Sequence, residues 1–238
     1  MNLDPPTNWG SDSIAKFIDL ARSNMFATFD NFEEQFDRLV AVDGAYTRLI
    51  DNLDDTDAWF TNLFLLNAHA CYLGGVQLGC SGQLPQSYMV LRGCLESSLY
   101  GFFFHNHPEK EQIWTSRHNS QENTKRVKAE FQITKMLKQF EQVDTTTGSI
   151  ITQLYNMTID LGAHPNVWGM FPHLDLPTDD SAGLGLKYIT DDMSDIVIAL
   201  ENCARVGICC LSVFSHICQK KFADLGLPID IDKLKSGL

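Results

Sequence analysis

The stretch that decides the fold is Tyr88–Phe104, which reads YMVLRGCLESSLYGFFF. It is apolar almost throughout, and its only charged residues are Arg92 and Glu96. At 3.6 residues per turn, a spacing of four places both charges on one face of an α-helix. A helix that is apolar on nearly every side is normally interior, so charges on it must be paired or functional. The stretch therefore predicts a central helix that carries one polar site.

Further segments have apolar residues at three- and four-residue spacing, which is typical of helices. They lie at about residues 14–21, 29–50, 58–78, 108–118, 121–143, 149–161 and 192–222. Pro85 suits the first turn of the central helix, and Pro108 its end. Because no long linker appears, we expect one helical domain over 1–238, with a loose leader at 1–10 and a peripheral tail at 228–238.

The segment 162–190 differs from the rest because it is rich in proline and glycine. Its two short runs of strand type, Val167–Leu174 and Leu184–Thr190, are joined by turn-forming residues. These features predict a small β-hairpin. The expected fold class is therefore mainly α, a multi-helix bundle with one small β-hairpin insertion before the last long helix.

The chain is acidic, with 30 acids against 18 bases and a net charge of −12. This charge opposes nonspecific attachment to nucleic acid or to an anionic membrane. Bases outnumber acids only locally, most clearly over residues 117–138. We interpret that basic segment as an ordinary solvated helix face, with RNA or an acidic partner as the alternative.

Three features predict a cytoplasmic protein. The first residues, MNLDPPTNWGSDS, have neither the basic nor the apolar region of a signal peptide. The seven cysteines are odd in number and form no C-x-x-C pair, which indicates free thiols in a reducing compartment. Residues 63–80 and 196–218 approach membrane length, but polar or charged groups interrupt both. We therefore interpret them as buried bundle helices and expect no membrane partner.

Arg92 and Glu96 have two possible roles. They form either a structural ion pair that joins the central helix to its neighbours, or part of a ligand pocket in which Arg92 binds a carboxylate or phosphate. Either role requires further polar groups to converge on the pair. The candidates on other helices are Asn67, His69, Tyr155, Asp160 and His164.

A second candidate motif is Leu161-Gly-Ala-His164-Pro-Asn166, where a helix is expected to end. A histidine at such a position can titrate near neutral pH, or it can cap the last carbonyl groups of the helix. The run His105-Asn106-His107 lacks the additional ligands that a metal site needs, so we predict no metal and no cofactor.

Two motifs together resemble a known class. They are Tyr88-x-x-x-Arg92-x-x-x-Glu96 on one helix and Tyr155-x-x-x-x-Asp160-x-Gly162-Ala-His164-Pro-Asn166 at the end of another. The combination resembles a loose set of uncharacterised bacterial all-helical proteins that are distantly similar to the HEPN helical bundles, over roughly residues 60–220. Some HEPN proteins are ribonucleases or toxins. Their motif, an arginine followed by a histidine four to six residues later on one helix, is missing here, so the resemblance bears on the fold more than on catalysis.

Two functional hypotheses follow. The first is a binding module that self-associates as a homodimer, because residues 196–218 are apolar around much of the helix circumference. A central position in one large core explains the same pattern. The second is a HEPN-like protein that acts on a nucleotide or RNA, with a polar pocket for a small anionic ligand around Arg92, Glu96 and His164. No residue pattern specifies a reaction, so the sequence leaves open whether the protein is an enzyme.

Overall fold

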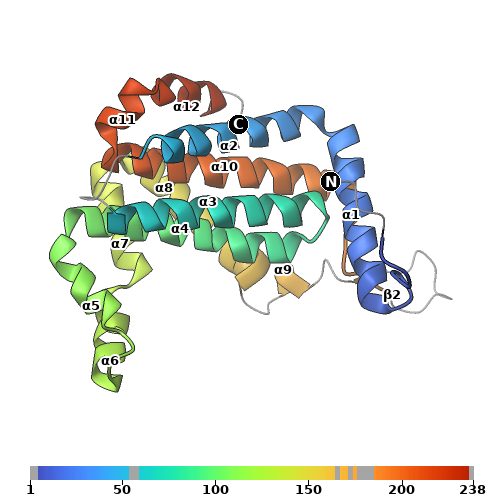
Figure 1. The fold of residues 1–238 in the computed structure, drawn as a ribbon, viewed down its shortest axis with the longest axis horizontal. Coiled ribbons are helices and arrows are strands. Elements are labelled where there is room, and N and C mark those ends of the chain that lie inside the picture. Colours follow the sequence, from blue (N-terminus) through green and yellow to red (C-terminus); the bar gives the residue numbers. More distant parts are fainter. Residues whose placement is uncertain (1–4, 54–58, 164–166, 171–173, 176–184, 236–238) are drawn as a thin grey trace.

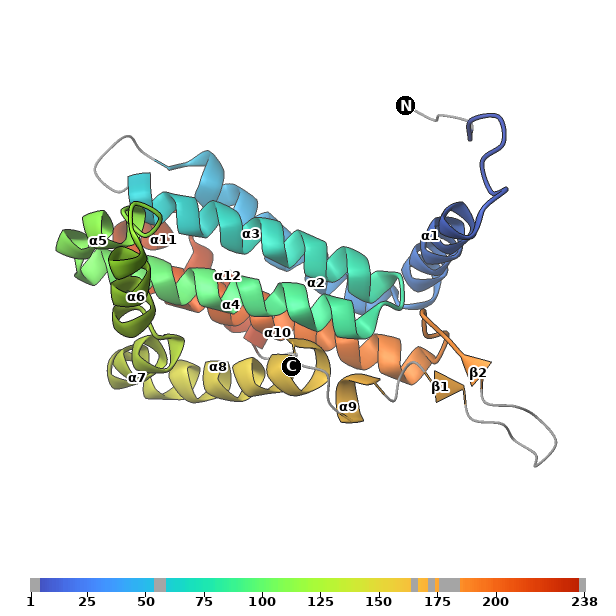
Figure 2. The same ribbon diagram turned by 90° about the horizontal axis from the view of Figure 1, so that it is seen from below.

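A computed structural model describes residues 5–53, 59–163, 167–170, 174–175 and 185–235. Three long helices form its centre: α3 (Trp59–Cys80), α4 (Leu84–Asn106) and α10 (Met193–Ile217). Helices α3 and α4 form an antiparallel hairpin, and α10 packs against both of them (Figure 1). Two further helices flank this centre, α2 (Glu33–Asp51) beside α10 and α3, and α8 (Thr145–Thr158) beside α4 and α10. Figure 2 shows α4 lying between α3 and α8.

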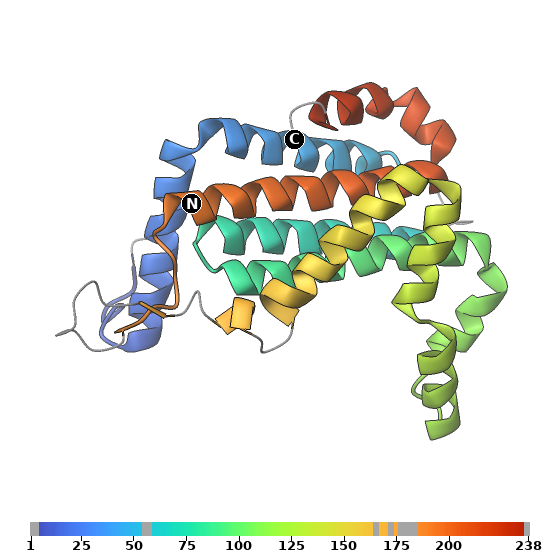
Figure 3. The ribbon, with the colours of Figure 1, turned by 180° about the vertical axis from the view of Figure 1, so that it is seen from behind.

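The remaining helices are shorter or lie at the ends of the bundle. They are α1 (Ser13–Asn31), α5 (Glu111–Thr115), α6 (Gln121–Glu130), α7 (Ile133–Val143), α9 (Val167–Met170), α11 (Gln219–Asp224) and α12 (Leu227–Lys235), with a 3₁₀ turn at Pro108–Lys110 and a π-helical turn, η2, at Ile159–Ala163. Figure 3 shows α1 projecting from one end of the bundle, and α5 and α6 from the other.

The core confirms that the fold is mainly α. Leu91, Leu95 and Leu99 of α4 are completely buried, as are Val206 and Leu211 of α10. Helix α4 therefore has the interior position that its apolar sequence predicts, and the apolar surplus of α10 is explained by a central position in the core.

The predicted helix over 121–143 is two helices, α6 and α7, which meet at Phe131. The Phe131 ring is buried against the rings of Tyr100 and Phe103. The Tyr100 hydroxyl donates a hydrogen bond of 3.2 Å to the Phe131 carbonyl oxygen. The chain bends here because tertiary packing, and not a proline or glycine, decides the path of the backbone.

The segment predicted as a peripheral tail contains helix α12. Its residues Leu227 and Ile231 are buried, and α12 packs on α10 and α2. Arg48 of α2 forms an ion pair of 2.6 Å with Asp230. As far as Lys235, the predicted peripheral tail is therefore a helix on the surface of the bundle, attached to it by an apolar face. At the other end of the chain, the described residues of the predicted loose leader form turns, and the Trp9 indole donates a hydrogen bond of 2.9 Å to Asp19.

A β-hairpin of the predicted extent is not found among the described residues. Val167–Met170 is helical, and strand pairing is limited to β1 (Leu174–Asp175) and β2 (Gly185–Leu186), which pair antiparallel. The remainder of the predicted hairpin lies outside the described residues. A short apolar run does not distinguish a strand from a helix by its periodicity, which explains why the prediction failed at Val167.

Helices α3 and α10 are long and apolar enough to cross a membrane by length and composition. In the bundle, 78% of the relevant stretch of α10 is buried, against 39% for α3. One face of α3 is therefore open, and the bundle core contains most of α10.

Candidate functional site

The candidate site lies where α8 and the π-helical turn η2 pack against α4. Asp144 begins α8 by accepting a hydrogen bond of 2.9 Å from the Thr147 backbone N–H, which is the usual role of an N-cap carboxylate. The close approach of η2 to α4 requires a glycine. A Cβ atom on Gly162 would lie 2.4 Å from the carbonyl oxygen of Pro85, which is too close for any side chain.

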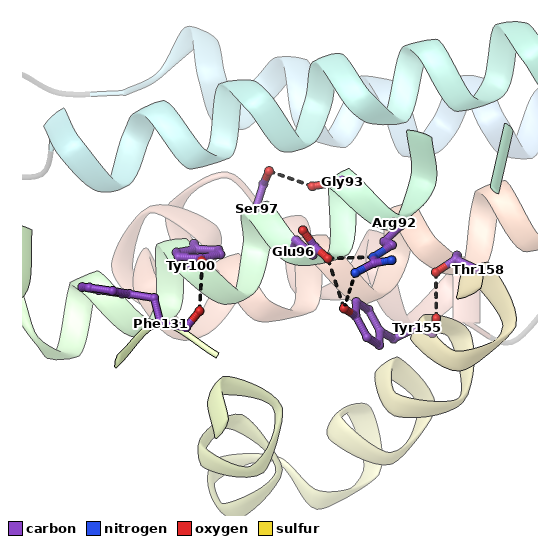
Figure 4. Close-up of polar contacts among 8 residues, drawn as sticks. All are labelled: Arg92, Gly93, Glu96, Ser97, Tyr100, Phe131, Tyr155 and Thr158. Carbon is purple, nitrogen blue, oxygen red and sulfur yellow. Dashed lines mark hydrogen bonds and ion pairs between the residues drawn. The ribbon is translucent and has the colours of Figure 1, made fainter. Parts of the chain in front are cut away.

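Arg92, Glu96 and Tyr155 form a closed triangle of hydrogen bonds (Figure 4). The Arg92 Nε donates to Glu96 Oε1 at 2.8 Å, and its Nη2 donates to the Tyr155 hydroxyl at 3.0 Å. The hydroxyl in turn donates to Glu96 Oε1 at 3.1 Å. The guanidinium carbon also lies 5.1 Å from the centre of the Tyr155 ring, within the range of a cation–π contact. Each of the three side chains is thus held by the other two.

The triangle is not sealed in the core. The side chains of Arg92 and Glu96 are 29% and 32% exposed, so the interior ion pair that the apolar sequence of α4 indicated lies instead at a surface opening. Charged groups in such a position keep contact with water, which lowers the desolvation cost of the pair.

The environment fixes the protonation states of two members of the triangle. Burial opposes the charge on Arg92, but the hydrogen bond and the negative charge of Glu96 outweigh it and raise the pKa of Arg92. Burial raises the pKa of Tyr155, and the negative charge of Glu96 raises it further. At neutral pH, Arg92 is therefore a cation and Tyr155 keeps its proton.

The triangle forms one wall of a cavity of about 410 Å³, which we name the Arg92 cavity. Its lining comes from α4, α6, α7, α8 and the turns beside them, and consists of Arg92, Glu96, Tyr100, Arg117, Val127, Lys128, Phe131, Gln132, Ile133, Thr134 and Tyr155. Three of these side chains are cationic and one is a carboxylate. The lining therefore has an excess of positive charge in a chain whose net charge is −12.

Arg117 is the unusual member of this lining. Its Nε is buried and has no hydrogen-bond partner, and the side chain forms no ion pair with any described residue. Lys128 likewise has no ion-pair partner in the part of the chain that the structure describes. Buried polar atoms are nearly always hydrogen-bonded, so an unpartnered guanidinium N–H in a cavity wall needs an explanation.

The predicted site residues separate into three groups. Arg92, Glu96 and Tyr155 are brought together, as the site prediction requires. Asp160 is exposed on η2 and does not line the cavity, so the structure does not bring it to the triangle. His164 and Asn166 lie outside the described residues.

Two other polar candidates are engaged elsewhere. Asn67 donates a hydrogen bond of 2.7 Å to the Ser97 hydroxyl, and a His69 ring nitrogen lies 2.6 Å from an Asp43 carboxylate oxygen. Both belong to contacts made by α3, away from the triangle. Within the described residues, no group of three or more His, Cys, Asp or Glu side chains is placed to hold a metal ion.

Of the eleven lining residues, eight were not predicted, and Tyr100, Arg117 and Lys128 are the three of these that the proposed site uses. Tyr100 follows Arg92 and Glu96 at the same four-residue spacing, which was a readable signal for one helix face. Arg117 and Lys128 belong to the basic segment that we interpreted as solvated. Arg117 lies in the turn after α5 and Lys128 on α6. Their common place in the cavity depends on the path of the chain from α5 through α6, and local sequence does not specify this path.

Comparisons with known proteins give no family for the chain: no family model matches it, and neither curated proteins nor solved structures give a significant match. The HEPN-like resemblance therefore stays a prediction.

Proposed function

We propose that the protein binds a small anionic ligand, of carboxylate or phosphate type, in the Arg92 cavity. The observation that carries this proposal is Arg117, whose buried Nε has no partner among the described residues. The same guanidinium lines the cavity, and an anionic oxygen that reached its Nε would satisfy that donor. Hydrogen bonds to charged groups are the strong ones.

The charge of the cavity supports the same conclusion. Arg92, Arg117 and Lys128 face only one carboxylate, Glu96, which is already bound by Arg92 and Tyr155. A concave site lined by one sign of charge concentrates ligands of the opposite sign. The overall negative charge of the chain opposes nonspecific attachment of anions to the rest of its surface.

Each side chain has a distinct part in the proposed site. Glu96 and Tyr155 hold the Arg92 guanidinium in one orientation, which leaves its remaining N–H donors for a ligand. Arg117 and Lys128 supply further positive charge to the lining. The described lining contains no histidine, cysteine or aspartate, so the proposal concerns binding and assigns no reaction.

Among anions we favour a nucleotide or RNA phosphate, the ligand class that the HEPN-like resemblance implies. The rings of Tyr100 and Tyr155 line the same cavity, and aromatic side chains commonly stack on bases. Three probes distinguish a site for phosphate alone from a site that also recognises a base. They are inorganic phosphate, adenosine monophosphate and a short single-stranded RNA, of which only the last two present a base.

Isothermal titration with these three probes and with citrate tests the proposal. Arg117→Met removes the unpartnered cation but keeps an aliphatic chain, and we expect it to weaken binding about tenfold or more. Lys138→Met is the matched control, because Lys138 is exposed on α7 and does not line the cavity. Binding of no probe to the native chain, or equal binding by Arg117→Met, would contradict the proposal.

A second candidate function is self-association through the open face of α3. Trp59, Leu63, Leu66 and Leu73 are between 44% and 57% exposed at spacings that place them on one side of this helix. Helix α3 contains no Asp, Glu, Lys or Arg. The face that we propose for a homodimer is therefore on α3, and not on α10, which the core already occupies.

Light scattering on the native chain and on Leu66→Glu tests self-association. We expect a dimer at micromolar concentration that the substitution dissociates, because burying an unpaired carboxylate in the interface is costly. Leu20→Glu on α1 is the control, because Leu20 is 55% exposed, against 44% for Leu66. A monomeric native chain would exclude the homodimer.

We also propose a cytoplasmic location. All seven cysteines are free thiols, and such a set fits a reducing compartment. Fractionation of the source cells tests this directly, and recovery in a secreted fraction would contradict it.

A further inference from the structure

A second cavity, of about 220 Å³, lies between α8, α10 and α12 and shares no residue with the Arg92 cavity. We name it the Arg205 cavity. It is lined by Thr146, Thr147, Ile150, Arg205, Ile208, Cys209, Ser212 and Lys235.

The inner part of this cavity is apolar. Ile208 and Cys209 are buried, and Ile150 is half-buried beside them. Burial raises the pKa of Cys209 to about 12, so its thiol is neutral and behaves as a small apolar group. The Ser212 hydroxyl donates its proton to the Ile208 carbonyl oxygen at 2.9 Å and is thus satisfied within α10. This inner surface suits a hydrocarbon chain.

The mouth of the cavity is cationic. Arg205 and Lys235 are exposed, and neither forms an ion pair with a described residue. Glu201, one helical turn before Arg205, does not pair with it. The nearest carboxylate at the start of α8, that of Asp144, is already engaged by the Thr147 N–H and by His216. The described lining contains no acid.

We propose that the Arg205 cavity binds a small amphipathic carboxylate, with its hydrocarbon chain inside and its carboxylate at Arg205 and Lys235. A cavity of 220 Å³ lies below the roughly 300–1,000 Å³ of sites for drug-sized ligands, so the chain must be short. The two cations give an anion its orientation, and the apolar walls supply the driving force.

Octanoate is the probe, titrated into the full chain by calorimetry and by NMR. We expect saturable one-to-one binding that Arg205→Gln with Lys235→Gln weakens about tenfold, since both charged contacts are lost. Both residues are exposed, so the variant keeps the fold. Ile208→Trp fills the inner cavity and should remove octanoate binding. Circular dichroism of this variant shows whether the loss of binding is due to unfolding. Lys138→Gln, on α7, is the control for loss of surface charge.

Three results would overturn the proposal. They are no saturable octanoate binding, equal binding by the Arg205/Lys235 variant, or equal binding of octylamine by the native chain. The last result would show that the mouth does not select a negative head group. Arg117→Met must leave octanoate binding unchanged, because Arg117 does not line the Arg205 cavity. The proposal for the Arg205 cavity and the proposal for the Arg92 cavity can therefore fail independently of each other.

Discussion

Replacing Glu96 by glutamine keeps the size of the side chain but removes its charge, and so tests whether the triangle of Arg92, Glu96 and Tyr155 holds α4 and α8 together. The glutamine carbonyl oxygen can still accept both hydrogen bonds, but the negative charge that pairs with the Arg92 guanidinium is lost. A hydrogen bond to a charged group contributes about 1.5–3 kcal/mol to stability. Because the two side chains are 29% and 32% exposed, solvent screening reduces this value, and we expect a loss of about 1–2 kcal/mol.

The chain contains a matched control for this prediction. Arg38 and Glu34 have the same four-residue spacing on α2, but their contact is 3.5 Å and the Glu34 side chain is 81% exposed. Glu34→Gln should therefore cost no more than about 0.5 kcal/mol. Urea unfolding of both variants gives the comparison.

A double-mutant cycle between Glu96→Gln and Tyr155→Phe measures the coupling free energy between Glu96 and Tyr155. Residues in one hydrogen-bond network couple by about 0.5–3 kcal/mol, and we expect a value within that range. Additive losses would refute the closed triangle. A loss of about 3–5 kcal/mol for Glu96→Gln would refute the open cavity, because only a buried pair costs that much to break.

Two further predictions concern the elements around the site. Gly162→Ala should destabilise the protein by about 1–3 kcal/mol in urea unfolding, because the added Cβ meets the Pro85 carbonyl oxygen, whereas Gly44→Ala in open space on α2 should be neutral or stabilising. Burial opposes the charge of Asp144, but hydrogen bonds from Thr147 and His216 outweigh it and lower the pKa of this carboxyl. The charged carboxylate therefore stabilises the fold fully above the unfolded pKa, about 4. This stabilisation is lost as the pH falls through the lower folded pKa. Asp144→Asn should therefore cost about 1 kcal/mol at pH 7, and the gap from the native chain should narrow as the pH falls below 4; a constant gap would contradict this assignment.

The central part of the fold was predictable from sequence because its signals are local. A long apolar run bounded by Pro85 and Pro108 specifies α4 almost to the residue, and the same holds for α3. The breaks at Phe32, Phe131 and Cys218 were not predictable, because no proline or glycine marks them. Each break lets a helix face follow the core, which is a property of the assembled bundle.

The candidate site divides in the same way. Arg92 and Glu96 stand out because an apolar helix makes any charge on it conspicuous, and Tyr155 was a candidate partner from a second helix. Arg117 and Lys128 were hidden in a basic segment whose pattern is that of a solvated surface. Only the path of the chain from α5 through α6 gives them a common cavity, and no local pattern specifies that path.

The most direct test of the central claim is the thermal stability of Arg117→Met with and without adenosine monophosphate. A ligand that binds only the native state raises the melting temperature, so the native chain should be stabilised by the nucleotide. Because Arg117 has a buried donor without a described partner, its removal should leave the ligand-free protein at least as stable as before and should abolish the ligand-induced rise. A variant that is less stable without ligand but keeps the full rise would show that Arg117 is structural, and would contradict an anion site in the Arg92 cavity.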